Sequence, residues 1–524
     1  MYETQDITCL AKPKRKGILS LVFSRFFIII LLIAVEFMVV LIPLFLLREY
    51  FPHFAGAMVL FTIVMLICIF NSKMDSTAKL TWIFFISVFR VGTALFYLFT
   101  QTNAGHRQIK KKTGQMVAET MDLIPQDPEV LKRLQEEDSY TDDLLTYLNR
   151  SGCFPAFADT EAEFFPLGED KFWAMLEELQ KAEKYIFMEY FIIEEGLMWG
   201  KILNILIEKA RAGVDVRVMY DGMCEISNLP AGYWKLLEKQ GIRAKAFSPI
   251  IPLISSHYNY RDHRKICVID GKTAFTGGVN LADEYINEVE RFGHWKDTAL
   301  MLKGDAARSF TLMFLQMWNA TEEEPDFTEA MSPAETPVNS GDKGYVIPYC
   351  DCPLDEDKVG EAVYMDILNR AGNYVHIMTP YLILDGELET ALKYAGQRGI
   401  DVKLILPGIP DKKMAYSLAK THYRTLLDAG VEIYEYTPGF VHAKVCISDD
   451  EKGVVGTINF DYRSLYHHFE CAAYLYKTPC IADMEKDFRE TLSKCRQVTR
   501  KTIKKEGLYY KLVGPVAKFI APLM

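Results

Sequence analysis

The chain has 524 residues, of which half are apolar and 11 are cysteine, and its formal net charge is −10. Its length exceeds that of one ordinary domain, and its acidic balance argues against a nucleic-acid-binding protein, which usually presents a basic face. The cysteines follow no disulfide-framework spacing, and the one close pair, Cys350 and Cys352, is too tightly spaced for the usual zinc knuckle.

Apolar residues are concentrated in the first 100 positions, in three segments of nearly membrane-spanning length. Residues 26–47 and 80–99 are long enough to cross a bilayer, whereas residues 55–70 are about one residue short of the usual range. A single segment of this kind is often a buried core helix or a signal peptide. Three in succession, with no small-residue cleavage site, predict a membrane anchor over residues 1–100 with two or three transmembrane helices.

Basic residues flank this anchor on both sides, at positions 12–16 and 107–112. Because positive residues favour the cytoplasmic side, both flanks are expected there, and that arrangement needs an even number of spans. Three apolar segments give an odd number instead. The sequence therefore leaves open how many segments cross the membrane and on which side the rest of the chain lies.

The remaining chain contains two similar α/β stretches. Residues 101–155 are polar with a helical pattern, and we expect a helical connector there. Strand and helix patterns alternate over 156–320 and again over 343–500, so each stretch predicts a mixed or parallel sheet covered by helices. Residues 321–342 are rich in proline and acidic side chains and predict a linker. The tail, 501–524, mixes lysines with apolar residues, as in an interfacial helix or a helix packed on the body.

The strongest signal is a motif that occurs once in each α/β stretch. Each copy has the form His-x-Lys-x4-Asp, followed by a Gly-Gly or Gly-Thr pair and then by asparagine. The first copy comprises His263, Lys265, Asp270 and Asn280, and the second comprises His442, Lys444, Asp449 and Asn459. Each residue of the second copy lies 179 positions after its counterpart. Repetition at one fixed offset predicts an internally duplicated α/β protein whose two halves carry the same chemistry.

These residue types suit reactions at a phosphodiester. A neutral imidazole can attack phosphorus and carry a phosphoryl group, while a second imidazole protonates the leaving alcohol. A duplicated fold with a pseudo-two-fold axis would place two histidines on one phosphate. Lys265 and Lys444 lie two residues along the same predicted strands, so their side chains share a face with the histidines and reach the phosphate oxygens. Asn280 and Asn459 can donate further hydrogen bonds to those oxygens.

The sequence leaves the roles of several other residues open. Asp270 and Asp449 are catalytic candidates, but their positions past the predicted strands suit turn formation or bonding to backbone equally well. Glu470, and in the first half an acid such as Glu189, are candidates for orienting the imidazoles. The histidines without a repeat partner are expected to be ordinary surface or core residues: His257, His294, His376, His422, His467 and His468. We predict neither metal nor cofactor, because the two lysines supply positive charge and the sequence has no clustered ligand set.

The motifs resemble those of the phospholipase D superfamily, and more narrowly those of its bacterial cardiolipin synthases. The similarity lies in residues 261–285 and 439–464, and in residues 79–99, which resemble the family's last membrane helix. Two positions depart from the family pattern: Asp262 stands where asparagine is common, and Arg90 lies near where a proline is usual. The resemblance covers nearly the whole chain.

The resemblance implies a duplicated phospholipase D-like sandwich, in which two mixed-sheet units flanked by helices follow the membrane anchor and share one active site. It implies that His263 is the nucleophile and His442 the general acid/base, although the residues alone do not distinguish this from the reverse. The implied reaction moves a phosphatidyl group from one phosphatidylglycerol to another and gives cardiolipin and glycerol through a phosphohistidine. The implied location is the bacterial cell membrane, as a multi-pass protein with no nucleic-acid partner.

Other functions are compatible with the same residues. Water as the acceptor would give a phospholipase D hydrolase, and another alcohol, such as serine, would give a different phosphatidyltransferase. A nuclease is disfavoured by the acidic charge and the membrane segments. A catalytically silent membrane scaffold is the alternative outside enzymes, and two intact His-Lys pairs argue against it. The sequence does not determine acceptor choice, acyl-chain preference or oligomeric state.

Overall fold

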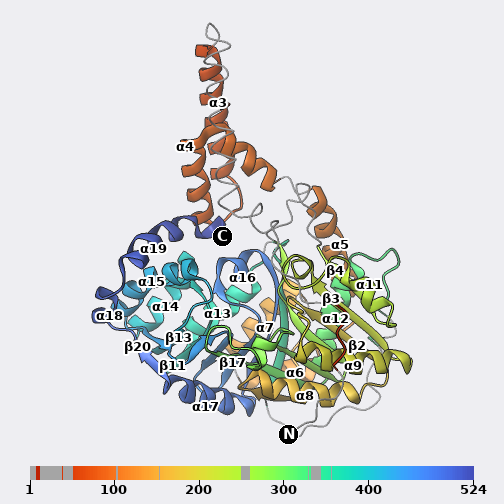
Figure 1. Cartoon of the computed structure of the whole chain (residues 1–524). Coiled ribbons are helices and arrows are strands. Elements are labelled where there is room, and N and C mark those ends of the chain that lie inside the picture. Colours follow the sequence, from red (N-terminus) through yellow and green to blue (C-terminus); the bar gives the residue numbers. More distant parts are fainter. Residues whose placement is uncertain are drawn as a thin grey trace. The chain divides into compact units, whose positions relative to one another are not determined.

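The computed structural model describes residues 7–11, 38, 51–101, 104–137, 139–152, 154–248, 260–327, 330–331, 344–355 and 357–523. The chain forms two compact units. The larger unit comprises Met1–Lys14, Gln108–Ile250 and Asn259–Ala517, and the smaller unit comprises Arg15–Arg107, Ile251–Tyr258 and Lys518–Met524. Both motif copies lie in the larger unit. Figure 1 shows the elements of both units, coloured along the sequence.

Two mixed β-sheets organise the larger unit. Across the first sheet, the order is β1 (Thr160–Phe165), β9 (Ala299–Gly304), β7 (Thr273–Gly277), β6 (Lys265–Ile269), β2 (Tyr185–Tyr190), β3 (Asp215–Asp221) and β4 (Arg243–Phe247). Across the second, it is β10 (Tyr345–Asp351), β19 (His468–Tyr476), β17 (Lys452–Gly456), β16 (Val445–Ser448), β11 (Tyr374–Met378), β13 (Asp401–Pro407), β14 (Glu432–Tyr436) and β20 (Cys495–Gln497). The short strands form the pairs β5 (Arg261–Asp262) with β19, β12 (Leu382–Ile383) with β18 (Phe460–Asp461), and β15 (Gly439–Val441) with β8 (His294–Lys296).

The two sheets repeat the same strand order, which confirms the predicted α/β fold with mixed sheets. In the first sheet β2, β3 and β4 run parallel, whereas β1, β9, β7 and β6 form an antiparallel ladder. In the second sheet β11, β13 and β14 run parallel, and β10, β19, β17 and β16 form the ladder. The antiparallel pairs β2–β6 and β11–β16 join the two parts of each sheet. Every strand of the first sheet thus has a counterpart in the second, and β20 is an addition.

Helices cover the sheets. In chain order they are α6 (Pro128–Glu137), α7 (Ser139–Gly152), α8 (Gly168–Gln180), α9 (Leu197–Arg211), α10 (Cys224–Ser227), α11 (Tyr233–Glu238), η1 (Asp283–Ile286), α12 (Ala306–Asn319), α13 (Val359–Arg370), α14 (Gly386–Gln397), α15 (Lys413–Asp428), α16 (Tyr462–Tyr466), α17 (Cys480–Leu492) and α18 (Arg500–Lys504). Two helices run across the boundary between the units, α5 (Ala104–Thr120) and α19 (Leu508–Ile520), and η2 (Ala521–Leu523) follows α19. Helices α5, α6 and α7 occupy most of the predicted connector.

The motif strands β6 and β16 are buried on both faces, which accounts for their continuous apolar runs. Along β6, Ile266 and Val268 join the core that the two sheets share with α12, whereas Cys267 joins the core beneath α8 and α9. Cys267 and its counterpart Cys446 are fully buried. Strands packed on both faces hold their ends rigidly, so the histidines just before β6 and β16 occupy fixed positions.

The smaller unit contains α3 (Phe51–Phe70) and α4 (Ser76–Gln101), which pack against each other through a small apolar core. Within the described residues, Ser76–Leu98 of α4 is the one segment that is long and apolar enough to cross a membrane. The apolar part of α3, Ala55–Phe70, is shorter. By length and composition, one membrane span is therefore available in this part of the chain.

The structure describes two of the three predicted membrane segments. The span expected at 80–99 lies within α4, and the segment 55–70 lies within α3. The span expected at 26–47 falls, apart from Met38, outside the described residues. Helix α4 is interrupted at Phe89 and Arg90, whose backbone angles are not helical. More than one membrane crossing therefore stays a prediction.

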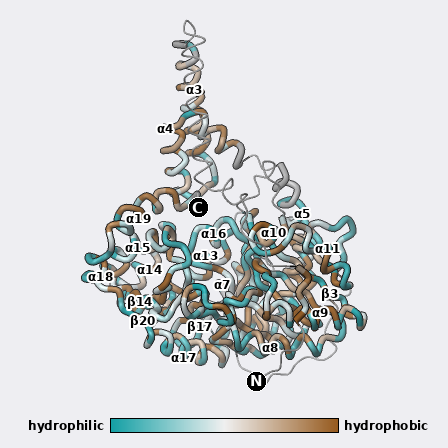
Figure 2. The backbone as a smooth tube through the Cα atoms, viewed as in Figure 1, coloured by the Kyte–Doolittle hydropathy of each residue, from teal (hydrophilic) through white to brown (hydrophobic). Residues whose placement is uncertain are grey.

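Helix α19 carries an uncovered apolar stripe. Leu508, Leu512 and Val516 are 72%, 62% and 64% exposed and lie four residues apart, on one face of the helix. Figure 2 shows the apolar character of this helix and of α4. Lys511 and Lys518 belong to the same helix, so it is amphipathic and basic.

Candidate active site

Each motif histidine directly follows a short strand that pairs with the opposite half of the chain. Strand β5 ends immediately before His263 and pairs in parallel with the start of β19, and β15 ends immediately before His442 and pairs in parallel with β8. The backbone N–H of His263 donates to the carbonyl oxygen of Phe469 at 2.9 Å. The backbone N–H of His442 donates to the carbonyl oxygen of Lys296 at 2.7 Å. At this point a short strand of each half pairs with a strand of the other half. The backbone of the opposite half therefore holds each motif histidine.

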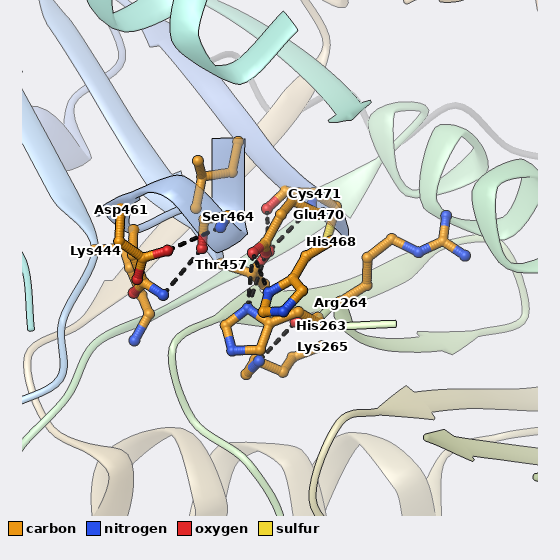
Figure 3. A network of polar contacts seen from close by, with 12 residues as sticks. His263, Arg264, Lys265, Lys444, Thr457, Asp461, Ser464, His468, Glu470 and Cys471 are labelled. Atoms are coloured by element: carbon orange, nitrogen blue, oxygen red, sulfur yellow. Dashed lines mark hydrogen bonds and ion pairs between the residues drawn. The ribbon is translucent and has the colours of Figure 1, made fainter. Parts of the chain in front are cut away.

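A carboxylate from the opposite half also holds each imidazole. Both oxygens of Glu470 lie 2.9 Å from Nδ1 of His263, an arrangement visible in Figure 3. Asp297 Oδ2 lies 2.6 Å from Nδ1 of His442. Both carboxylates are fully buried. A carboxylate on Nδ1 keeps the proton there and fixes the ring orientation, so Nε2 of each histidine is left to face a substrate.

The protein environment keeps both imidazoles neutral. Burial is the largest cause that lowers the pKa of His263 well below its ordinary value, and the positive charges of Lys265 and Lys444 lower it further. Burial, followed by the charge of Lys444, lowers the pKa of His442 to about 4. A neutral imidazole has an unprotonated nitrogen, so either ring can attack phosphorus near neutral pH.

The motif lysines are buried beside the imidazoles. Lys265 Nζ donates to the backbone oxygen of His263 at 2.6 Å, and Lys444 Nζ donates in the same way to its own motif histidine. Burial lowers the pKa of Lys265 to about 8 and that of Lys444 to about 7. A buried ammonium group is costly without an anionic partner, and a bound phosphodiester would provide one.

The motif aspartates bond to the backbone. Asp270 accepts hydrogen bonds from the three consecutive N–H groups of residues 183–185, each at 2.8 Å. Asp449 accepts from residues 372–374 at 2.7, 2.7 and 2.9 Å. Both aspartates have positive φ, 54° and 56°, in the turn after the motif strand. Of the two roles that the sequence left open, the geometry supports the structural one, in which each carboxylate fixes the start of β2 or β11. A catalytic role stays a prediction.

The motif asparagines are buried and partly tied to neighbouring side chains. Asn280 Nδ2 donates to Tyr285 Oη at 2.8 Å, and its Oδ1 accepts from the N–H of Ile192 at 3.1 Å. Asn459 Nδ2 donates to Ser464 Oγ at 3.0 Å, while its Oδ1 has no hydrogen-bond partner among the described residues. Each amide nitrogen has one further N–H, so donation to a phosphate stays a prediction.

Comparison with known proteins identifies the family. Residues 175–318 and 364–492 match the family described as cardiolipin synthase, PLD-like domain. A cardiolipin synthase of Alkalihalophilus pseudofirmus is 31% identical over 471 residues, which cover 87% of this chain and 91% of that protein. The chain belongs to the cardiolipin synthase family. It is therefore a phosphatidyltransferase of the phospholipase D type, as the motifs predicted.

The chain is also similar to a further bacterial protein and to a solved structure. An uncharacterized protein of Streptococcus mutans is 56% identical over 454 residues, which cover 87% of this chain and 98% of that protein. The crystal structure of phosphatidylserine synthase from Haemophilus influenzae covers 73% of this chain and 98% of its own, with a TM-score of 0.56 at 15% sequence identity. That likeness shows a shared fold.

In this member of the cardiolipin synthase family, the sequence predicted one of the two orienting acids. Glu470 holds an imidazole as expected. The choice of Glu189 was wrong, because its Oε1 accepts a hydrogen bond from Arg264 Nε at 2.7 Å, and Asp297 holds the second imidazole instead. The motif gave one signal for this acid: a Cβ atom on Gly278 would lie 1.9 Å from Asp297 Oδ1. The second glycine of the motif makes room for the carboxylate.

His468 is a site residue that the sequence analysis treated as ordinary. Its ring centroid lies 5.1 Å from that of His263, and Figure 3 shows the two rings side by side. The side chain is buried, and neither ring nitrogen has a hydrogen-bond partner among the described residues, although Nδ1 lies 3.5 Å from Glu470 Oε1. Burial lowers the pKa of His468 to about 3, so the ring is neutral. It can donate or accept a hydrogen bond with a bound substrate.

Some side chains of the described part of the chain could hold a metal ion. The two candidate groups are His263, His468 and Glu470, and Glu361, Asp385 and Glu387. The first group lies beside Lys265 and Lys444, whose positive charges oppose a cation there. Chemistry without a metal stays a prediction for this family member.

Proposed function

We propose that the protein is a cardiolipin synthase that transfers the phosphatidyl group of one phosphatidylglycerol to another and releases glycerol. The observation that carries the proposal is the pair of buried, neutral imidazoles, each held at Nδ1 by a carboxylate of the opposite half. The substrate class comes from the relatives that are cardiolipin synthases.

In the first step, Nε2 of His263 attacks the phosphorus atom of phosphatidylglycerol, and the bond from phosphorus to the glycerol oxygen breaks. His442 gives a proton to the departing oxygen, so glycerol leaves neutral and the phosphatidyl group stays on His263. The negative charge of a bound phosphodiester raises the pKa of His442, which couples protonation of this ring to substrate binding. Asp297 stabilises the imidazolium form.

In the second step, a hydroxyl group of another phosphatidylglycerol gives its proton to His442, and its oxygen attacks phosphorus. The bond from phosphorus to His263 breaks, cardiolipin forms, and both rings return to their starting states. Lys265 and Lys444 stabilise the negative oxygens in both steps, as preorganised donors do. A carboxylate holds Nδ1 of both imidazoles, so the choice of His263 as the nucleophile rests on the family resemblance.

The proposal includes a multi-pass membrane location, because both substrates lie in the bilayer. Residues 1–100 would form the anchor, and Ser76–Leu98 has the length and composition of a span. The apolar stripe of α19, with Lys511 and Lys518 beside it, suits the boundary between headgroups and acyl chains. This location keeps the site close to both substrates.

Product analysis tests the proposed reaction. Purified protein in mixed micelles with labelled phosphatidylglycerol is expected to give cardiolipin and one glycerol for each cardiolipin formed. Replacing His263 with Asn should lower turnover by about 10³-fold or more, because the covalent intermediate can no longer form. Phosphatidic acid in place of cardiolipin would make the protein a hydrolase, and no conversion by folded protein would favour the silent scaffold.

The chain offers a matched control for this variant. His376 is another buried histidine held by a carboxylate, with Glu485 Oε2 at 2.9 Å from its Nδ1, but it lies on β11 and in neither motif. His376→Asn removes a comparable buried pair and is expected to keep turnover per folded molecule. An equal loss in both variants would point to damaged folding and would remove the support for His263.

A further inference from the structure

A small hollow that opens to solvent lies beside the second motif histidine. Its lining includes the polar residues Tyr381, Asp411 and Lys412, and the aromatic residue Phe440. Phe440 stands two residues before His442, and their ring centroids are 5.9 Å apart. The hollow therefore adjoins the imidazole that handles the alcohol in the proposed reaction, and neither motif contributes to its walls.

We propose that this hollow is the acceptor subsite, which binds the glycerol-phosphate headgroup of a second anionic phospholipid. Lys412 pairs with the acceptor's own phosphodiester, and Tyr381 and Asp411 bind its hydroxyl groups. The inference rests on the proposed transfer reaction and assigns residues to its second substrate.

The polar groups of the hollow are connected and point to such a ligand. Lys412 Nζ donates to Tyr381 Oη at 2.6 Å, and Tyr381 Oη donates to Asp411 Oδ2 at 2.6 Å. Lys412 Nζ also donates to Asp411 Oδ2 at 2.5 Å, which positions the ammonium group at the rim. The Lys412 side chain is 64% exposed, whereas that of Asp411 is 15% exposed. The ammonium group can thus meet a phosphate from solution, while the carboxylate and phenol lie deeper and suit hydroxyl groups.

The hollow also lies within electrostatic reach of the nucleophile. The ring centroids of Tyr381 and Phe440 are 6.5 Å apart, and the ring of Phe440 in turn lies beside that of His442. The charge of Lys412 is among the causes that lower the pKa of His263, after burial and the nearer groups of the site. An anion bound at Lys412 would therefore act electrostatically on the imidazole that carries the phosphatidyl group.

The order of the two steps identifies the occupant. His442 acts on glycerol when it leaves and on the hydroxyl group of the acceptor when it enters, so both alcohols occupy its side of the site. Free glycerol carries no phosphate, and the donor phosphate contacts the motif lysines. Only the acceptor brings a second phosphodiester, so Lys412, which pairs with Asp411 in the protein, meets a lipid phosphate in the second step alone.

Replacing Lys412 with Met tests the inference. With phosphatidylglycerol as the acceptor, we expect kcat/KM to fall about tenfold, which corresponds to about 1.4 kcal/mol. Transfer to water or to added ethanol should fall less, because neither carries a phosphate, so the ratio of phosphatidic acid and phosphatidylethanol to cardiolipin should rise. Lys412→Arg, which keeps the charge, should restore most of the cardiolipin.

Lys413 provides the matched control, because it is the next residue along the chain, is exposed and does not line the hollow. Lys413→Met is expected to leave all product ratios unchanged. An unchanged ratio in Lys412→Met, or an equal loss of every product, would overturn the subsite. A wild-type enzyme that forms phosphatidic acid but no cardiolipin would instead refute the transfer reaction itself, so the two failures are distinguishable.

Discussion

At the scale of single residues, burial lowers the pKa values of the two motif lysines, so each loses its proton and its charge more readily. Burial lowers the pKa of Lys444 from 10.5 to about 7 and that of Lys265 to about 8. A lysine is charged below its pKa and neutral above it, so the empty site loses positive charge as the pH rises through this range. Because an anionic phosphodiester needs that charge, substrate capture should weaken over the same range.

The pH dependence of the reaction should report these lysines. We expect the alkaline limb of kcat/KM for phosphatidylglycerol to have a midpoint near pH 7, since kcat/KM reflects the free enzyme. The limb of kcat should lie higher, because bound phosphate raises both lysine pKa values. In Lys444→Arg the guanidinium group stays charged, so the midpoint should move toward that of Lys265, near 8. Initial rates across the pH range check this, and an unmoved midpoint in the arginine variant would contradict it.

The repeated motif predicted the site residues that occur in both halves, and it missed the site residues that occur in only one half. The structure brings the histidines and lysines of both motifs into one site. Asp297 and Glu470 play equivalent roles, but one precedes β9 and the other lies within β19, so no constant offset links them. His468 has no counterpart at all in the first motif. Each half holds the histidine of the other within one shared site, and a comparison of the two halves cannot reveal such contacts.

At the scale of elements, each motif aspartate ties the turn after its strand to the start of a neighbouring strand. Burial raises the pKa of Asp449, but the N–H groups of residues 372–374 outweigh it and hold this pKa below its ordinary value of 3.8. Its contribution to stability is therefore present above that value and is lost as the pH falls through the lowered pKa. The hydrogen bonds of this carboxylate connect the end of β16 to the start of β11.

Substitution of this aspartate separates the structural role from a catalytic one. Asp449→Asn should lower the free energy of unfolding by about 1–3 kcal/mol, because charge-assisted hydrogen bonds to backbone are lost. Turnover per folded molecule should stay within a few-fold of the wild type. Denaturant unfolding and the product assay measure the two effects, and Asp270→Asn, in the other half, should behave alike. A loss of turnover near 100-fold with unchanged stability would give the aspartates a catalytic role.

The long elements were predictable and the decisive short ones were not. Alternating apolar runs and helical patterns predicted two α/β stretches, and the paired sheets agree with them. Strands β5 and β15 have two and three residues, too few for any periodic signal. They form only because the opposite half presents an edge for them to pair with, so they depend on tertiary contacts that the sequence pattern does not express.

At the scale of the whole molecule, the N-terminal residues bear on membrane topology. The N–H groups of Leu10 and Ala11 donate to Glu195 Oε1 at 3.1 and 3.2 Å, and Ile7 packs against Gly200. These residues thus belong to the larger unit, although the membrane segments separate them from the rest of it. A compact unit cannot be divided by a bilayer, so residues 7–11 and the catalytic residues lie on one side. In the proposed multi-pass arrangement, the chain between them therefore crosses the membrane an even number of times, as the basic flanks also predict.

Cysteine labelling in intact cells tests this topology. We expect Cys9, which is exposed, and a cysteine introduced by Lys413→Cys to react alike with a membrane-impermeant maleimide, each in a background without the other cysteines. A cysteine introduced by Asn71→Cys, in the turn between α3 and α4, should show the opposite accessibility if α4, which has the length and composition of a span, crosses the bilayer after it. That result would leave an odd number of crossings before Asn71, so only one of the segments 26–47 and 55–70 would span. Opposite labelling of Cys9 and the residue-413 cysteine would show that the N-terminal segment does not dock on the catalytic unit, and all three apolar segments could then cross.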